Sequence, residues 1–261
     1  NPLTRNLVFL ALPGSDQRHD VVLGGQGTLI NSATLDTTTR RGAALRTASA
    51  TSGMSWPFPE AITATRRQVT MLIWILPTTL AAGNNLIDIP HNEAWNVPEG
   101  LMLRRDGNTS SGQFGYPDSA TTEIRVSSDT GFIQSTDPLT CYAVTRDEAT
   151  VLFYLNGRQH GASKTLATNA DFVWNATRKP IAVLTRSQGS PAEGWTAATC
   201  DYAAIWARAL SPAEVWNLFT NPYSVLLGAG ARRVKAAAGA PAAGWGPLLD
   251  GTRNRLIYVP R

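Results

Sequence analysis

The chain has 261 residues, of which 43% are hydrophobic and only 16% charged, so it can bury a sizeable core and is not disordered as a whole. Its formal net charge of +4 is unevenly distributed, because residues 228–261 carry +5 and residues 1–227 carry −1. The nearly neutral body lacks the basic face of nucleic-acid-binding proteins, and no apolar run reaches 18 residues, so we expect neither nucleic acid nor a membrane as partner.

Short β-like runs, separated by Gly, Pro, Asn, Asp, Ser and Thr, dominate the chain. Many short strands with frequent turn signals are typical of a β-sandwich or barrel, and strict alternation of strands with helices is absent. We expect strands at Leu7–Leu12, Ala43–Thr47, Val69–Leu76, Leu86–Ile89, Leu101–Arg104, Gln113–Tyr116, Glu123–Ser127, Cys141–Thr145, Val151–Leu155, Ile181–Thr185 and Ala198–Trp206.

The clearest hairpin runs from Tyr142 to Gly157. Its first turn is expected at Arg146–Ala149, and the pair Asn156-Gly157 tolerates the positive φ angles of a second tight turn. Val151 and Phe153 alternate with apolar neighbours, so we expect both faces of this strand to be partly covered, as in a sandwich with a further layer on its back.

One helix is well signalled. The segment Ser211–Glu214 has Ser at the N-cap, Pro at the first helical position and Glu at the third, which is the pattern of a capping box. Val215, Leu218 and Phe219 then share one face, and the helix is expected to end before Pro222. A helix this short is marginal in isolation, so it must dock on the sheets.

The composition changes after Gly228. Between Gly228 and Pro247, 15 of 20 residues are Ala, Gly or Pro, which is typical of a linker or extended arm. We therefore divide the chain into a domain at 1–227 and a basic arm at 228–261 that ends in the short strand Leu256–Val259. The two cysteines, Cys141 and Cys200, lie in strand-like runs and are expected to be buried thiols, with a bridge between neighbouring strands left open.

Four motifs, in this order, resemble the laminin-G-like, concanavalin-A-like jelly-roll family. Gly42–Arg46 resembles its early Gly-x-Ala-Leu strand, and Gln68–Ile75 its strand with a central Trp. Tyr154–Gly157 resembles its Tyr-x-Asn-Gly turn, and Trp206–Glu214 its final Trp-x-Arg-x-Leu-Ser-x-x-Glu strand and helix. The resemblance covers about residues 1–227. It implies a two-sheet antiparallel jelly-roll sandwich with one short C-terminal helix, here followed by an extended arm.

A second resemblance is to versions of this module among bacteriophage structural proteins. It is carried by Asn1–Leu7, by Asn221–Tyr223 after the helix and by the Ala/Arg-rich tail. It implies a virion component, a head decoration or fibre protein or a tail protein, which is assembled in the host cytoplasm. Its expected partners are other virion proteins and further copies of itself.

The glycosidases of this superfamily have carboxylates at alternate positions of one strand, Glu-x-Asp, where a nucleophile and an acid flank the glycosidic bond. No Glu in this chain has an Asp two residues later. Asp147-Glu148 is better interpreted as a hairpin turn, and Glu93 with Glu99 as loop charges. We therefore expect no enzyme, with a glycoside hydrolase or lyase kept as a remote alternative.

No cofactor is expected from the sequence. His19, His91 and His160 are far apart in polar loop-like settings, and none has a second ligand at metal spacing. Laminin-G-like modules often bind calcium at the sandwich rim, and Asp88, Asp106 and Asp118 lie at or beyond strand ends. Such residues are usually turn formers, so calcium stays open and no metal ligands are assigned.

Eight tryptophans raise the alternative of a carbohydrate-binding, lectin-like module. Trp74, Trp206 and Trp216 fall in regular elements and are expected in the core. Trp95 and Trp195 lie in polar loops and are the candidates for an exposed platform that stacks on a cell-surface glycan, with packing under long loops as the simpler alternative.

The arm is the second candidate site, either as a solvated tail or as a strand added to a neighbouring subunit. Its backbone would supply the hydrogen bonds and its basic residues the register. The candidate contact residues are Arg232, Arg233, Lys235, Arg253, Arg255, Leu256, Ile257, Tyr258 and Val259. The sequence thus favours a non-enzymatic virion structural protein that makes protein contacts and contacts with the host surface.

Overall fold

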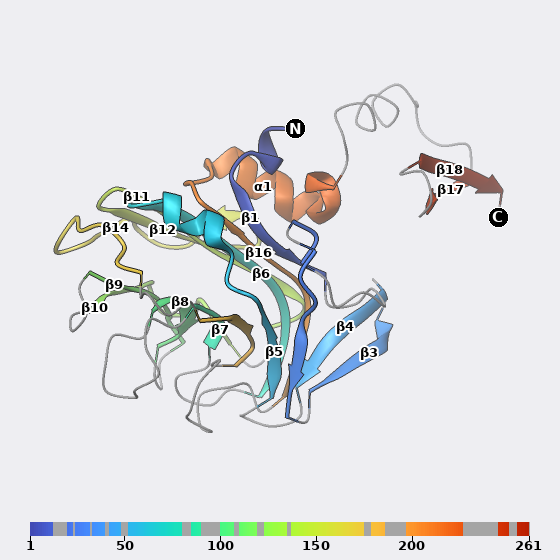
Figure 1. Cartoon of the computed structure of the whole chain (residues 1–261), viewed down its shortest axis with the longest axis horizontal. Coiled ribbons are helices and arrows are strands. Elements are labelled where there is room, and N and C mark those ends of the chain that lie inside the picture. Colours follow the sequence, from blue (N-terminus) through green and yellow to red (C-terminus); the bar gives the residue numbers. More distant parts are fainter. Residues whose placement is uncertain are drawn as a thin grey trace.

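The computed structural model describes residues 1–12, 20–22, 24–31, 33–39, 42–47, 52–79, 85–89, 100–106, 110–118, 123–134, 137–174, 179–185, 197–226, 245–250 and 255–260. Two antiparallel sheets face each other as a sandwich, and one short helix lies on the back of one sheet (Figure 1). The all-β jelly-roll architecture expected from the sequence is confirmed.

The described strands are β1 (Leu7–Ala11), β2 (Thr28–Ile30), β3 (Thr34–Thr39), β4 (Gly42–Thr47), β5 (Gly53–Trp56), β6 (Gln68–Thr79), β7 (Asn85–Ile89), β8 (Leu101–Arg105), β9 (Gly112–Pro117), β10 (Glu123–Ser127), β11 (Thr140–Asp147), β12 (Thr150–Leu155), β13 (Arg158–Gln159), β14 (Lys164–Thr165), β15 (Ile181–Val183), β16 (Ala197–Trp206), β17 (Trp245–Asp250) and β18 (Arg255–Pro260). The helical segments are α1 (Pro212–Thr220) and the 3-10 turns η1 (Pro2–Thr4), η2 (Glu60–Ala64) and η3 (Pro222–Val225).

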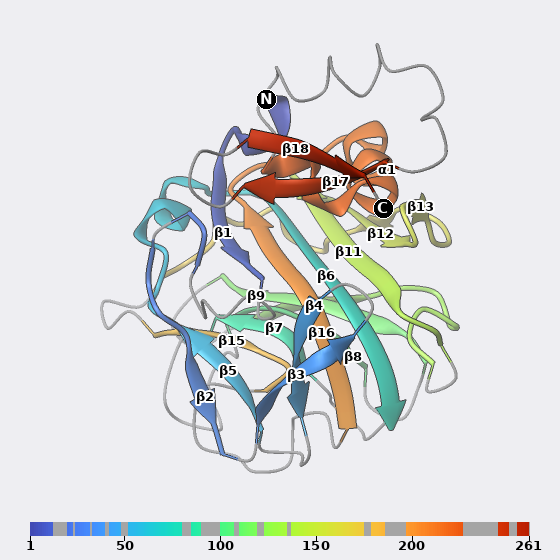
Figure 2. The same ribbon diagram turned by 90° about the vertical axis from the view of Figure 1, so that its right-hand side faces the viewer.

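The sandwich consists of a large and a small sheet. The large sheet has the strand order β13-β12-β11-β6-β16-β4-β3, with β1 paired to β16 and β14 paired to β12. The small sheet has the order β10-β9-β8-β7-β15-β5-β2. Figure 2 shows β11, β6 and β16 side by side in the large sheet. The hairpin β17–β18 is a separate two-stranded sheet.

The strand β6 serves two apolar layers because its side chains alternate. Met71 and Ile73 belong to the core between the sheets, whereas Leu72 and Trp74 belong to the layer between the large sheet and α1. Burial on both faces explains the continuous apolar run in this segment. In β12, Val151 and Phe153 face the inter-sheet core and Tyr154 belongs to the layer under α1, so both faces are covered, as the sequence predicted.

Helix α1 begins with the expected capping box. The Ser211 hydroxyl accepts from the backbone N–H of Glu214, and the Glu214 carboxylate accepts from the N–H of Ser211. Two buried residues of its apolar face, Val215 and Leu218, dock on the outer face of the large sheet. The short helix is therefore stabilised by its cap and by burial rather than by its length.

The motif Trp206–Glu214, which begins at the last residue of β16, holds the N-terminal segment against α1. The guanidinium of Arg208 donates to the Glu214 carboxylate at 2.7 Å and to the carbonyls of Pro2 and Arg5 at 2.9 and 3.1 Å. The indole N–H of Trp206 donates to the carbonyl of Leu3 at 2.7 Å. The motif therefore joins the first turn of the chain to the last strand and helix of the body.

A buried arginine closes the opposite, inter-sheet side of the large sheet. Arg146 of β11 is fully buried, and its guanidinium carbon lies 4.0 Å from the centre of the Tyr116 ring and 4.6 Å from that of Phe172. It donates to the carbonyls of Glu148 at 2.9 Å and Ala170 at 2.5 Å. Burial lowers the pKa of this guanidinium, because removing the charged group from water costs free energy. The hydrogen bonds and the cation–π contacts offset part of that desolvation cost.

The expected strands are all present, with ends that differ by a few residues, and the turn at Asn156-Gly157 has the expected positive φ angles of 51° and 77°. The sequence missed β2, β3, β5, β13, β14 and β17, which are short, rich in Thr or interrupted by Gly and Pro. Trp74 and Trp206 are buried as expected, but the prediction for Trp216 is wrong. This residue is 41% exposed, because its ring lies at the edge of the large sheet, beside Phe219 and Arg158, and not beneath the helix.

The two cysteines are free and buried. Cys141 on β11 pairs with Trp74, and Cys200 on β16 pairs with Ile75, so the central strand β6 lies between them. They also face opposite sides of the large sheet, since Cys141 belongs to the layer under α1 and Cys200 to the inter-sheet core. A bridge between them is therefore excluded by geometry. No helix in the described residues is long and apolar enough to cross a membrane.

The Arg208–Glu214 pair should stabilise the body measurably, because both side chains are mostly buried and share the helix cap. We expect a double-mutant cycle of Arg208→Ala and Glu214→Ala to give a coupling energy of about 1 kcal/mol at pH 7 in urea unfolding. Arg208 holds the pKa of Glu214 below its ordinary 4.5, so this coupling persists above that pH and fades as the pH falls through the lower folded value. An equal coupling at pH 7 and pH 2 would contradict this.

Replacement of the buried Arg146 tests how much its contacts with two carbonyls and two aromatic rings stabilise the sandwich. Arg146→Lys should lower the free energy of unfolding by about 2 kcal/mol, because an ammonium group lacks the planar fork that reaches both carbonyls while stacking on the rings. The exposed Arg125 is the matched control, and Arg125→Lys should change stability by less than about 0.5 kcal/mol. Equal effects of the two changes in urea unfolding would show that the burial of Arg146 contributes nothing.

Candidate functional site

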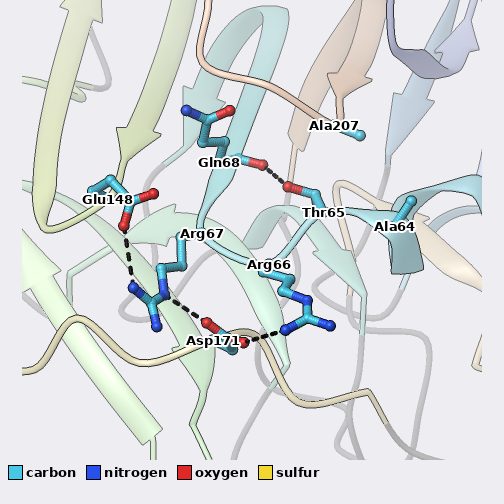
Figure 3. A pocket seen from close by; sticks show the side chains of 8 residues that line it. All are labelled: Ala64, Thr65, Arg66, Arg67, Gln68, Glu148, Asp171 and Ala207. Atoms are coloured by element: carbon cyan, nitrogen blue, oxygen red, sulfur yellow. Dashed lines mark hydrogen bonds and ion pairs between the residues drawn. The ribbon is translucent and has the colours of Figure 1, made fainter.

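A polar pocket lies at one end of the sandwich, among the described residues. It forms where the segment leading into β6, the β11–β12 turn and the loop 169–172 meet, and its volume is about 500 Å³. Figure 3 shows the side chains around it, which are mostly charged or polar. The lining residues are Ala64, Thr65, Arg66, Arg67, Gln68, Glu148, Asp171 and Ala207.

Arg67 is the electrostatic centre of this pocket. Its Nε lies 2.5 Å from Asp171 Oδ1, and its Nη1 lies 3.4 Å from Glu148 Oε2 (Figure 3). The hydrogen bonds with Asp171 and Glu148 raise the pKa of Arg67. The more exposed Arg66 makes only a longer contact with Asp171, at 3.5 Å. The two carboxylates therefore share one well-placed cation.

The backbone positions these charges. Glu148 adopts a positive φ of 54° in the β11–β12 turn, and its carboxylate accepts from the amide of Asn169 at 2.9 Å. That hydrogen bond, together with Arg67, lowers the pKa of Glu148. The N–H of Phe172 donates to the carbonyl of Arg66 at 2.7 Å, which fixes the neighbouring Asp171 beside Arg67. The pocket is thus built on the loop that Arg146 also holds.

A second, smaller cavity of about 300 Å³ shares Gln68 with the pocket. It is lined by Arg5, Arg208 and Glu214 among others, which are the residues that hold the N-terminal segment. Gln68 itself donates to Asp147 at 2.7 Å. Together the two cavities give this end of the large sheet a run of guanidinium, carboxylate and amide groups.

Groups of this kind suit a ligand that both donates and accepts hydrogen bonds. Charged donors and acceptors make the stronger hydrogen bonds in proteins, and a polyhydroxylated ligand offers many partners of both kinds. Acid–base catalysis makes a different demand, because a general acid needs a pKa raised towards the working pH. In Glu148 the environment shifts the pKa the other way.

Neither predicted platform residue, Trp95 or Trp195, lies within the described residues. Described residues that flank the two segments lie at opposite ends of the sandwich. Ile89, before the first segment, pairs with Leu101, at the same end of the small sheet as Tyr116 and therefore at the pocket end. The second segment ends at Ala197, which pairs with Thr79 at the far end of β6 from Gln68, roughly 36 Å away along the strand.

The three aspartates considered for calcium, to which the sequence assigned no ligand role, lie at or near the ends of three different strands. Asp88 is buried in β7, Asp106 follows β8 and accepts from Gln113 and Ser127, and Asp118 follows β9. Among the described residues, no group of three or more His, Cys, Asp or Glu side chains is placed to hold a metal ion. His160 makes a hydrogen bond with the carbonyl of Thr130, whereas His19 and His91 lie outside the described residues.

Most basic residues of the predicted arm, namely Arg232, Arg233, Lys235 and Arg253, also lie outside the described residues. The expected strand Leu256–Val259 falls within β18, together with Arg255. It pairs with β17 of the same chain, an element that the sequence did not predict. The two-stranded sheet is therefore formed within the arm, and its strands do not pair with either sheet of the body.

Sequence reasoning missed the residues of the pocket. Glu148 was interpreted only as part of a turn, and Arg66, Arg67 and Asp171 carry no recognisable motif. The available signal was the pair Arg66-Arg67 immediately before the buried strand β6, since charged residues at a strand end lie at the rim of a sandwich.

A family model described as the concanavalin A-like lectin/glucanases superfamily matches residues 48–216. No curated protein sequence matches the chain. One similar solved structure is the binding domain of Paraclostridial Mosquitocidal Protein 1, with 18% identity and a TM-score of 0.63 over 85% of this chain. Another is Domain 4 of AbnA, a GH43 extracellular arabinanase from Geobacillus stearothermophilus, which was solved in complex with arabinotriose. It has 18% identity and a TM-score of 0.58 over 82% of this chain.

A third similar structure is Trypanosoma rangeli sialidase, with 16% identity and a TM-score of 0.56 over 84% of this chain. The chain spans 53% of the mosquitocidal protein structure, 33% of the sialidase and 98% of the AbnA domain. At these identities the likeness shows the fold. Since the family model covers most of the chain, this protein belongs to the concanavalin A-like lectin/glucanases superfamily.

Proposed function

We propose that this chain is a non-enzymatic binding module that takes a cell-surface carbohydrate in the pocket around Arg67 and is carried on a bacteriophage particle. The observation that carries the proposal is the pairing of both pocket carboxylates, Glu148 and Asp171, with one arginine. These groups are arranged to make hydrogen bonds with a ligand and not to exchange protons with it.

The fold gives independent support for a carbohydrate ligand. Domain 4 of AbnA, which is similar over almost its whole length, was solved in complex with arabinotriose. In this chain, Ile89 and Leu101, the described residues on either side of the Trp95 segment, pair at the pocket end of the sandwich, and for this reason we propose Trp95 rather than Trp195 as the stacking platform.

The virion assignment rests on the sequence resemblance to phage structural proteins. Two segments that carry it meet in the structure, because the side chain of Asn1 donates to the carbonyl of Ser224 at 2.8 Å, close to Asn221–Tyr223. In this proposal residues 1–227 form the body, and the basic arm 228–261 contacts other virion proteins and further copies of the chain. A glycoside hydrolase or lyase is the remote alternative, and the matched Trypanosoma rangeli sialidase is an enzyme of which this chain spans 33%.

A glycan array tests the ligand. Arg67→Ala should weaken carbohydrate binding by about tenfold or more, because it removes a charge-assisted donor and releases both carboxylates from their common partner. Arg125→Ala is the matched control, since Arg125 is also ion-paired and its side chain is 39% exposed against 41% for Arg67. It should leave binding unchanged.

In the same array, Trp95→Ala should reduce binding and Trp195→Ala should not. An array without hits would remove the carbohydrate proposal. Equal losses from Arg67→Ala and Arg125→Ala, with both variants folded by circular dichroism, would move the binding site away from the pocket.

The particle assignment has its own test. If the chain is a virion component, mass spectrometry of gradient-purified phage particles from cells that carry its gene should detect it at many copies per particle. A variant truncated after Leu227 should be lost from the particles while it still folds. Particles that lack the full-length chain would contradict the assignment.

A further inference from the structure

The hairpin β17–β18 has a composition that does not suit a free surface. Apart from Asp250 and Arg255, which are paired at its turn end, all its strand residues are aliphatic, aromatic, Gly or Pro. An isolated two-stranded sheet is at best marginally stable in water, and a third strand or a packed layer is needed to stabilise it. Figure 1 shows the hairpin apart from the two sheets of the body.

The two edges of this hairpin differ in their capacity to accept another strand. In an antiparallel pair, alternate rows exchange hydrogen bonds, and the remaining residues turn their N–H and C=O groups outward. Pro247 pairs with Tyr258 and Pro260 pairs with Trp245, so both prolines belong to the same set of rows. Because proline has no N–H to donate, these rows are the ones that face outward.

This assignment leaves one open edge. On β17 the outward positions are Trp245, Pro247 and Leu249, and the proline in the middle interrupts the row of donors. On β18 the outward positions are Leu256, Tyr258 and Pro260. Leu256 and Tyr258 each offer a backbone N–H and C=O to a further strand, and Pro260, which has no N–H, lies only at the end of the strand. A further strand can therefore add to β18 but not to the middle of β17.

We propose that the β18 edge pairs antiparallel with β18 of a second copy of this chain, with Ile257 opposite Ile257 at the two-fold axis. This pairing rests on the assembly role proposed for the arm, and it specifies which partner the arm contacts and in which strand register. In this register Leu256 of each copy exchanges hydrogen bonds with Tyr258 of the other, so the edge is self-complementary. Arg255 of each strand lies opposite Val259 and not opposite another arginine, so no like charges face each other within the bounds of β18.

Cross-linking tests the register directly. At the axis, Ile257 forms a pair without hydrogen bonds, where the Cα atoms of antiparallel strands lie about 4.5 Å apart, within the range of a disulfide. Purified full-length Ile257→Cys should form a disulfide-linked dimer under mild oxidation, while the native cysteines stay buried. The matched control Leu248→Cys lies in the same row on β17 and should stay monomeric on a non-reducing gel.

A backbone change tests the edge. Tyr258→Pro removes an outward donor from β18 and keeps the hydrogen bonds within the hairpin, so it should weaken self-association at least tenfold in sedimentation velocity. Leu249→Pro makes the same change on the interrupted β17 edge and should leave self-association unchanged.

The pairing is overturned if Ile257→Cys does not cross-link, if Leu248→Cys cross-links equally, or if the two proline variants behave alike. Its failure is distinguishable from failure of the proposed function. A chain that does not cross-link but is still lost from particles on truncation after Leu227 keeps its assembly role with a different partner, whereas retention of the truncated chain removes the role itself.

Discussion

The buried guanidinium of Arg146 is the constraint on which the candidate site depends. It is placed in the core by the alternation of β11, and no carboxylate within hydrogen-bonding distance neutralises it in the described structure. Instead it donates to two backbone carbonyls and to the side-chain oxygen of Asn169, and it lies against two aromatic rings, which brings the end of the small sheet and the loop 169–172 onto the large sheet. The charges of the pocket are attached to this same loop and turn.

The pocket therefore combines a rigid base with a polar rim. Its carboxylates come from a strained turn and from a loop that the buried arginine holds, and a second arginine, Arg67, pairs with both of them. A site of this kind makes hydrogen bonds at little cost in reorganisation. The hydrogen bonds from Asn169 and Arg67 lower the pKa of Glu148, whereas the general acid of a glycosidase needs a raised pKa, and this is why we propose binding and not hydrolysis.

Much of the fold could be predicted because the signals are local. The apolar run around Trp74, the turn at Asn156-Gly157 and the cap at Ser211 each fix the backbone within a few residues, and the structure confirms them. The pocket could not be predicted, because Arg67, Glu148 and Asp171 are far apart in sequence and meet only after the sheets pack. Trp216 was misplaced because a two-turn helix has one narrow buried face, and hydrophobicity alone does not assign a residue to it.

The central claim is that the pocket holds a carbohydrate without changing it. The most direct measurement is calorimetric titration of the chain with its best-binding oligosaccharide, followed by mass spectrometry of the recovered ligand after long incubation. We expect saturable binding and an oligosaccharide of unchanged mass. Shortened products that disappear with Glu148→Gln or Asp171→Asn would contradict the account and would make this protein an enzyme of its superfamily.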